Sequence, residues 1–419
     1  MINKRLRVFV FASAWILAVR ATRGEAADLP IPPEAIASPV KPPGKAEGNV
    51  HSYQDDNRLY VTSVSAGIEH PILTNVSVRA RAVADWITIM AGEATAPAPG
   101  DPHAGHEGHD HIEEDDNPII ADAVSGASAR VSNSPVNSRE TRIEGVLGLS
   151  LRLNQGNRPV TLSAEGRGSH EPDYSSWAGA LSGQAELFRG NTLVSAFLGT
   201  GRDRVSPAAD PPGQAGKWPA TQSKMSGGFS LAQSVTPRLL LSGGASAALQ
   251  TGRLSSPYRN SLVGITYFPE KLPRERLRAT AFVQASLYLG MGAALHMRQG
   301  LYSDDWGVTA WIPETAIAEE LGPRALLTLK HRFYAQAPAD FHKSVYPDRK
   351  GFQSGDLRLG TIYDQMAAAL LEYRIVRPSG RAGPIVLSVE YAFSRKEYPD
   401  LYPKVLLSHV FSMGVRTDY

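Results

Sequence analysis

The stretch NVSVRARAVADW, residues 75–86, alternates strictly between apolar and polar side chains over most of its length. Val76, Val78 and Trp86 fall in one phase of the alternation, whereas Arg79 and Asp85 fall in the other. A period of two is typical of a β-strand, because successive side chains point to opposite faces of a sheet. The stretch therefore predicts a strand with one apolar face and one polar face.

The same alternation recurs along most of the chain. Further runs lie at residues 147–154, 160–167, 177–187, 193–201, 225–233, 239–250, 276–287, 306–312, 325–336, 385–394 and 405–415. Turn sequences such as NQGN and RPSG separate them, and their polar faces carry Arg, Glu, Gln and Lys, as a water-filled lumen allows. This pattern predicts an all-β protein, an antiparallel transmembrane β-barrel; a soluble all-β protein is the alternative.

The length of the patterned region predicts the size of the barrel and the role of its last strand. If residues 74–419 form one barrel, ~22 residues for each strand and its turns predict about 14 to 16 strands. The last strand ends in Tyr419, with Phe411 in the same phase, and is similar to the assembly signal of outer-membrane barrels. We therefore expect outer-membrane lipid around the barrel and recognition of this strand by the barrel assembly machinery. Interfacial aromatic girdles would contain Trp177, Trp306, Trp311, Tyr334 and Tyr391.

The beginning of the chain predicts export. A basic start precedes the apolar run at residues 8–19, and small residues follow it, which is the pattern of a secretory signal peptide over residues 1–26. The run is shorter than the ~20 residues that a membrane helix needs. Residues 27–73, which include LPIPPEAIASPVKPPGKAEG, are predicted to be a proline-rich periplasmic linker without regular structure. The predicted location is the outer membrane of a Gram-negative bacterium.

Composition narrows the function. The chain has no cysteine, which excludes a thiol nucleophile, a lipobox anchor and a disulfide framework. Its 43 basic and 41 acidic residues nearly balance, which argues against nucleic acid as a partner. No G-x-S-x-G motif is present, and His331 and His409 lie in the apolar phase of their strands, so no enzymatic activity is expected. Asp304 and Asp305 are adjacent and are interpreted as a turn cap rather than a catalytic pair.

A histidine-rich segment, HAGHEGHDHIEEDD at residues 103–116, lies within a loop predicted at residues 92–117. Its candidate metal ligands are His103, His106, His109 and His111. Imidazole binds Cu, Ni and Zn ions, but nothing in the sequence supplies the rigid frame that a closed structural site needs. The segment therefore predicts weak capture of a transition metal, and a merely solvated loop is the alternative.

Seven segments resemble, in this order, a known family. They are DAVSGASARVSN (122–133), VTLSAEGRGSHEPDYSSWAG (160–179), GRLSSPYRN (252–260), EKLPRERLR (270–278), LYSDDWGVTA (301–310), LKHRFYAQAPADF (329–341) and SGDLRLG (354–360). The set resembles the DUF3570 family of predicted outer-membrane β-barrels and covers most of residues 74–419. The resemblance implies the fold and the location but no catalytic residues, because the function of the family is unassigned. The histidine-rich segment is not part of this resemblance.

Two function classes follow. The first is a channel or transporter for small solutes or ions. The second is a non-conducting barrel that holds periplasmic or surface partners, with transition-metal capture by the histidine-rich loop. The sequence identifies neither the solute nor the partner.

Overall fold

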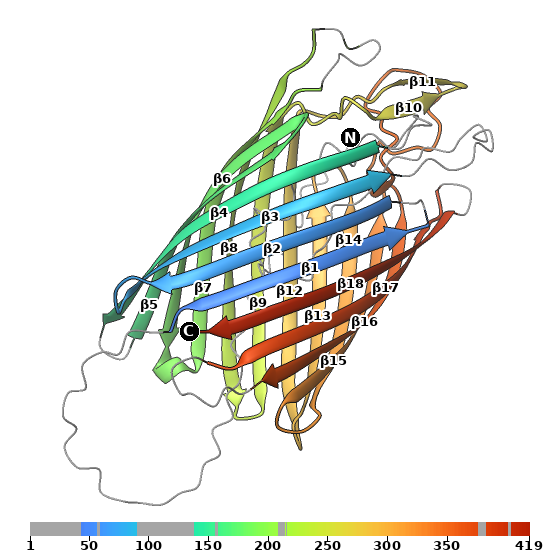
Figure 1. The fold of residues 1–419 in the computed structure, drawn as a ribbon. Coiled ribbons are helices and arrows are strands. Elements are labelled where there is room, and N and C mark those ends of the chain that lie inside the picture. Colours follow the sequence, from blue (N-terminus) through green and yellow to red (C-terminus); the bar gives the residue numbers. More distant parts are fainter. Residues whose placement is uncertain are drawn as a thin grey trace, which may run out of the picture.

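A computed structural model describes residues 43–56, 59–89, 138–155, 158–207, 214, 216–375, 383–400 and 404–419. Within these residues, sixteen antiparallel strands close into one barrel (Figure 1). The predicted antiparallel barrel is confirmed, with the largest of the predicted strand numbers. The predicted signal peptide, the proline-rich stretch up to residue 42 and the predicted histidine-rich loop lie outside the described residues.

The barrel strands follow one another around the ring in chain order. Their bounds are β1 (Lys45–Asp55), β2 (Leu59–Pro71), β3 (Val76–Ile89), β4 (Ser138–Gln155), β5 (Arg158–Glu171), β6 (Tyr174–Leu187), β7 (Thr192–Val205), β8 (Ala220–Thr236), β9 (Leu239–Gly252), β12 (Glu275–Gly290), β13 (Ala293–Asp304), β14 (Thr309–Glu320), β15 (Ala325–Ala337), β16 (Ile362–Ile375), β17 (Ile385–Tyr398) and β18 (Lys404–Asp418). A separate hairpin, β10 (Asn260–Val263) and β11 (Thr266–Pro269), lies between β9 and β12 in the sequence.

The ring is closed by the first and last strands. β1 pairs with β18 from Lys45 opposite Asp418 to Asp55 opposite Ser408. Gly44 and Tyr419 extend the ladder, since each backbone N–H donates to the other residue's carbonyl at 2.9 Å. Closure leaves no sheet edge with unpaired backbone groups, which is how a β-structure satisfies its hydrogen bonds in lipid.

The predicted boundary of the barrel is wrong. The linker is predicted over residues 27–73, but β1 and β2 occupy residues 45–55 and 59–71 and are two strands of the barrel. The alternation is weak here because the outward positions of β1 include Ala46, Gly48 and Ser52, and both faces of β2 carry apolar residues. Backbone pairing with the strands on either side holds β1 and β2 in the barrel, although the hydrophobicity of their two faces differs little.

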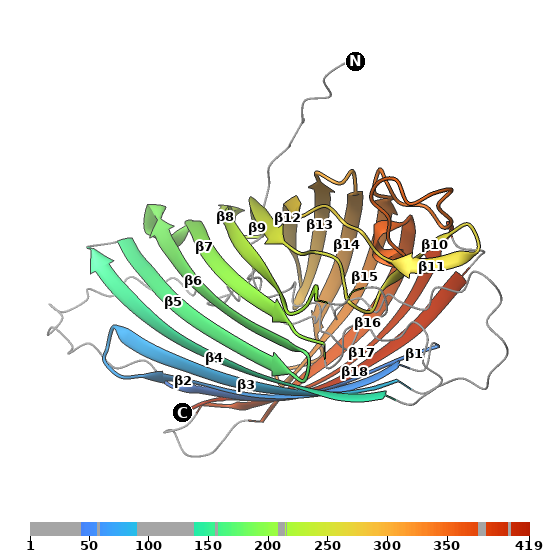
Figure 2. The same ribbon diagram turned by 90° about the horizontal axis from the view of Figure 1, so that it is seen from above.

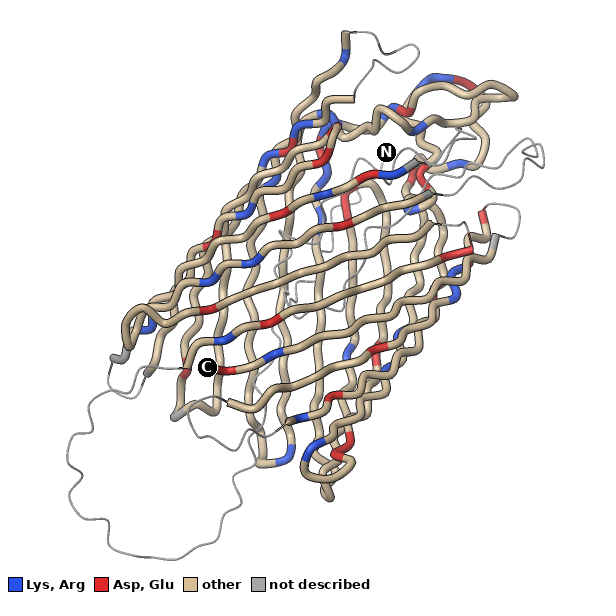
Figure 3. Tube along the Cα trace, in the orientation of Figure 1, with Lys and Arg blue, Asp and Glu red and all other residues tan. Residues whose placement is uncertain are grey.

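The two faces of the wall differ in chemistry, and the register preserves the difference around the ring. Leu149 pairs with Val78 on one side and Ala164 on the other, so their side chains share the outer face. Outward Leu147 and Leu181 are 67% and 65% exposed, whereas polar side chains dominate the buried inner wall. Basic and acidic residues are interspersed over the strands of the barrel (Figure 3). This is the pattern of a barrel with lipid outside and water inside.

The aromatic prediction is confirmed in part. Trp177, Trp311 and Tyr391 face outward and are about half exposed. Trp306 instead lies buried in the connection between β13 and β14, and Tyr334 belongs to the inward phase of β15. These two residues do not belong to an outer girdle.

We call the barrel end that holds Lys45 and Asp418 the terminal rim and the opposite end the far rim. Connections at the terminal rim include the turn at residues 291–292, where Met291 and Gly292 both have positive φ. The longer connections, at residues 206–219, 253–274 and 338–361, all leave from the far rim. In the described part of the chain, no helix has the length and apolar character to cross a membrane.

Candidate functional site

The inner wall carries ion pairs between neighbouring strands. They include Arg142–Asp85, Arg167–Glu144, Lys224–Asp203, Arg276–Asp304, Lys330–Glu314 and Arg332–Asp364. Most lie in the half of the barrel nearer the far rim, because these residues occur near the strand ends at that rim. The period-two pattern places them inside, since each lies in the phase of its strand opposite to the outward-facing residues. The lumen is therefore lined with paired charges.

A group of three buried carboxylates lies at the far-rim end of this wall. One oxygen each of Glu140, Glu171 and Asp173 lies within 4.8 Å of the others, a spacing that suits a divalent cation. Arg142 interacts electrostatically with Glu171, and the Tyr258 hydroxyl donates to Asp173 at 2.6 Å. The group is thus already engaged by protein groups, and no ligand is assigned to it.

A serine, a histidine and a carboxylate also meet on the inner wall. His51 Nδ1 lies 2.6 Å from Ser412 Oγ, and Ser412 pairs across the ladder with Glu390. These residue types make up hydrolase triads, but here the serine stands between the other two. The backbone of β18 is paired on both sides along this row, so its amides cannot form an oxyanion hole. We interpret the row as cross-strand hydrogen bonding.

The far rim carries a folded cap made from the connections 253–274 and 338–361. Its small apolar core contains Trp306, Val308, Ala339 and Leu359, with Leu254, Leu272, Tyr302 and Phe341 packed against it. Asp304 supports this core, because its Oδ1 accepts hydrogen bonds from the backbone of Trp306 and of Val308, both at 3.0 Å. The predicted turn-cap role of Asp304 is confirmed. The β10–β11 hairpin extends from β9 and β12 toward β16 and β17 (Figure 2).

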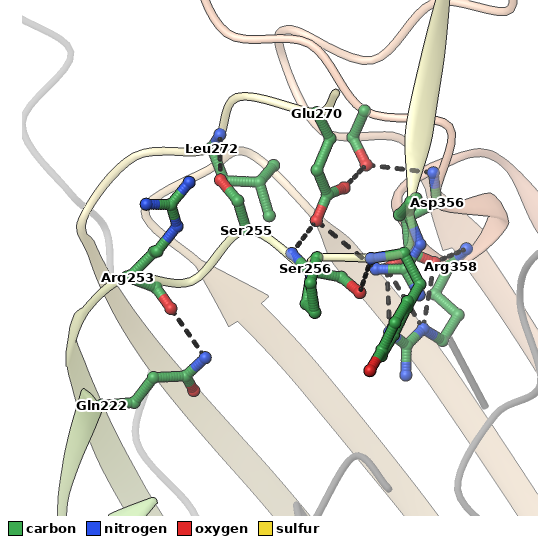
Figure 4. A network of polar contacts seen from close by, with 12 residues as sticks. Gln222, Arg253, Ser255, Ser256, Glu270, Leu272, Asp356 and Arg358 are labelled. Atoms are coloured by element: carbon green, nitrogen blue, oxygen red, sulfur yellow. Dashed lines mark hydrogen bonds and ion pairs between the residues drawn. The ribbon is translucent and has the colours of Figure 1, made fainter. Parts of the chain in front are cut away.

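A buried ionic network joins the two connections (Figure 4). Arg259 Nη1 lies 2.9 Å from Asp356 Oδ2 and 3.8 Å from Glu270 Oε1. Arg358 forms a fork on the same aspartate, with Nη2 at 2.8 Å from Oδ2 and Nε at 3.0 Å from Oδ1. Ser354 Oγ donates to Glu270 Oε2 at 2.6 Å. Two arginines and two carboxylates therefore neutralise one another where water is excluded.

The two carboxyl groups titrate differently. Burial raises the pKa of Glu270 above its ordinary value of 4.5, although Arg259 and Ser354 act in the opposite direction. Burial also acts to raise the pKa of Asp356, but Arg259 and Arg358 outweigh it and hold this pKa well below the ordinary 3.8. Asp356 is thus the firmly ionised centre of the network, and Glu270 depends on Arg259 to remain charged.

The cap crosses the mouth of the barrel at the far rim. Tyr258 donates to Asp173 in the β5–β6 connection, and the adjacent Arg259 pairs with Asp356 in the β15–β16 connection. Eight strands separate these two connections in either direction around the ring of sixteen, so they are rooted on opposite sides. Gln214, in a third connection, donates to the Pro257 carbonyl at 3.0 Å. The mouth is therefore spanned by a continuous chain of polar contacts.

Several residues of this network lie in the segments that carry the family resemblance, although sequence reasoning assigned them no role. Arg259 lies in the segment 252–260, Glu270 in 270–278 and Asp356 in 354–360. The sequence signal that could have identified these residues is the clustering of charged residues and glycines in the connections between strands. The four predicted metal ligands, His103, His106, His109 and His111, lie outside the described residues. β3 ends and β4 begins at the far rim, so the chain leaves and rejoins the barrel on the same side as the cap.

Comparison with known proteins finds one family and several outer-membrane structures. The DUF3570 family, described as a protein of unknown function, matches residues 12–369. No curated protein matches the sequence. Among solved structures, a bacterial polysaccharide outer membrane secretin is similar at 11% identity, with 90% of this chain and 98% of that chain covered and a TM-score of 0.48.

Siderophore receptors show the same kind of likeness. The ferric enterobactin receptor PfeA of Pseudomonas aeruginosa is similar at 12% identity over 85% of this chain, with a TM-score of 0.42. The receptor PirA of Acinetobacter baumannii is similar at 12% identity over 85%, with a TM-score of 0.40. This chain spans about half of the length of these receptors, 54% and 53%. At these identities and scores, no substrate or partner is carried over.

Proposed function

Because this chain belongs to the DUF3570 family, for which no function is assigned, we propose a role from its own geometry. The protein is a channel or transporter for small hydrophilic solutes or ions in the outer membrane of a Gram-negative bacterium. The role is not enzymatic. The observation that carries the proposal is the closed ring of sixteen described strands with an apolar outer face and a charged, hydrogen-bonded inner wall.

The distribution of connections supports an orientation. Outer-membrane barrels have short periplasmic turns and longer extracellular loops. The terminal rim, which holds both ends of the barrel, would then face the periplasm, consistent with export directed by a signal peptide at residues 1–26. The cap at the far rim would face the cell exterior, as would the end of β3 and the start of β4.

The size of the ring and the cap together support small solutes as cargo. Barrels of ~16 strands enclose a lumen wide enough for an aqueous channel. The polar contacts from Asp173 to Asp356 cross the external mouth of this lumen. A mouth divided in this way restricts passage to solutes smaller than the lumen itself, and the paired charges of the wall favour hydrated cargo.

Single-channel recording in planar bilayers tests the proposal. The full exported chain should produce discrete conductance steps, and the same preparation unfolded by heat should produce none. Migration on SDS gels before and after heating checks that the sample is a folded barrel. A folded, inserted barrel that stays electrically silent at every voltage would remove the channel.

That silent outcome would favour the second function, a non-conducting scaffold for periplasmic or surface partners. The cap is the observation that supports it, since a rigid external structure held by buried ion pairs could present a binding surface. In this role the histidine-rich loop would capture Cu, Ni or Zn ions at His103, His106, His109 and His111. Assembly into the membrane through the strand that ends at Tyr419 is proposed in both cases.

A further inference from the structure

The outer face of the barrel is almost free of charge, which makes its few charged residues informative. Among outward strand positions with described side chains, the charged residues are Arg139, Arg202, Arg204, Glu275, Glu319, Arg395 and Glu397. Arg395 and Glu397 form an ion pair. Arg202 and Arg204 are both exposed, stand two residues apart on β7, and pair with no carboxylate of the described residues.

The neighbours of these two arginines are hydrogen-bonding groups and one aromatic ring. Arg204 lies opposite Ser175 on β6, and Ser175 in turn lies opposite His170 on β5. Arg202 lies opposite Trp177, which is 58% exposed. Side chains directly opposite across a ladder are ~5 Å apart, close enough to contact one ligand together. The described outward positions of β5 to β8 include no acidic residue that would compete for the arginines.

The two arginines stand at the upper boundary of the apolar band. β7 ends at Val205 on the far rim, one residue beyond Arg204. Below them, Leu198, Leu181 and Met225 are each more than 60% exposed and begin the apolar surface. An outward arginine costs ~2–4 kcal/mol at the bilayer midplane but only ~0–1 near the interface, where lipid phosphates lie. Their position, above the exposed apolar residues and next to the end of β7, suits contact with those phosphates.

We propose that Arg202 and Arg204, with His170 two strands away in the same row, bind the phosphate of an anionic lipid headgroup in the membrane leaflet at the far rim. The planar guanidinium donates two parallel hydrogen bonds to phosphate oxygens, and two guanidinium groups on one strand hold one phosphate or a pair of them. The acyl chains of the same lipid lie along the apolar surface that begins at Leu198. The inference rests on the membrane placement of the proposed function, but it does not depend on conductance.

The test is lipid retention by the full chain in vesicles of phosphatidylcholine with a minor fraction of diphosphorylated lipid A. After extraction in mild detergent, native mass spectrometry should show lipid A bound to the wild type. Arg202→Gln and Arg204→Gln should each weaken retention about tenfold, as expected for loss of a charge-assisted hydrogen bond. Arg395→Gln, a matched change on the outer face of β17, should retain lipid A as the wild type does.

Other outcomes would overturn the proposal. Equal retention by the wild type and by the Arg202→Gln/Arg204→Gln double variant would do so, as would equal retention of lipid A from which both phosphates had been removed. Displacement of lipid A by millimolar inorganic phosphate would assign the site to free phosphate instead. Flotation of the vesicles separates this proposal from the proposed function, because an inserted, conducting barrel that retains no lipid A contradicts only the lipid site.

Discussion

Replacement of Arg259 by methionine should release the cap from the barrel mouth. The Arg259 side chain is 4% exposed and lies between Asp356 and Glu270. In the Arg259→Met variant, Asp356 keeps the fork of Arg358, whereas the fully buried Glu270 loses its nearby guanidinium. Methionine fills a similar volume, so the perturbation is mainly electrostatic.

The loss of cap stability in Arg259→Met depends on how Glu270 responds to the removal of the guanidinium. The folded cap avoids a buried charge by protonating Glu270. From an ordinary pKa of 4.5 this costs at most about 3.4 kcal/mol at pH 7, because the raised pKa of Glu270 in the wild type already carries part of the cost. The figure agrees with the ~3–5 kcal/mol that is typical when one partner of a buried ion pair is removed. A loss of about 3 kcal/mol raises the open population of the cap about a hundredfold.

Hydrogen exchange measured by mass spectrometry reports this population directly. Peptides from residues 253–274 and 338–361 should exchange about a hundredfold faster in Arg259→Met, while peptides from the barrel strands should not change. Arg349→Met is the matched control, since Arg349 lies in the other connection of the cap, 338–361, and its guanidinium lies 4.2 Å from the centroid of the Phe268 ring. Its effect should be less than about tenfold, as for an exposed cation–π contact.

A double variant separates the electrostatic cause from simple loss of packing. Arg259→Met/Glu270→Gln removes the stranded carboxylate, so its exchange should be slower than that of Arg259→Met alone. Single-channel conductance should rise in Arg259→Met if the cap restricts the mouth. Exchange in Arg259→Met that matches the wild type would refute the argument that the buried network holds the cap.

Three further predictions concern pH, assembly and metal. Acidification should act on the cap in two opposite ways. Because the pKa of Glu270 is raised, the cap gains stability as pH falls through that pKa toward 4.5. Because burial lowers the pKa of His342, the cap loses stability as pH falls below 6.5. Hydrogen exchange against pH should lose the first effect in Glu270→Gln and the second in His342→Asn, and profiles unchanged by both variants would contradict the assignment. Deletion of Tyr419 removes two backbone hydrogen bonds to Gly44. Cell fractionation should then show less heat-modifiable barrel in the membrane while export continues. Normal barrel levels would argue against this strand as the assembly signal. A peptide of residues 100–117 should bind Cu²⁺ more tightly than Ni²⁺ or Zn²⁺, and the affinity should fall below pH ~6.5. If calorimetry finds equal Cu²⁺ affinity after its histidines are replaced by alanine, the metal hypothesis is wrong.

The parts of the fold that could be predicted are those that depend on local alternation. In β4, Leu147 and Leu149 alternate with Gly148 and Ser150, and such strands assign their own inner and outer faces without reference to a partner. β1 could not be recognised in this way, because Gly48 and Ser52 on its outer face contrast little with the inner face. Its place is set by pairing with β18, more than 350 residues away in the chain, and such pairing leaves no local signal.

By itself, the sequence determined that the chain is a β-barrel with an apolar exterior, because a side-chain period of two directs every second residue to the same face. The tertiary structure alone decided what lies across the mouth. Tyr258 meets Asp173 and Arg259 meets Asp356 because ring closure brings connections from opposite sides of the barrel to one rim. Residues in connections follow no period, so the sequence does not indicate which of their charges will meet. Once buried together, these charges require their partners, since an unpaired ion in a site without water is too costly to keep.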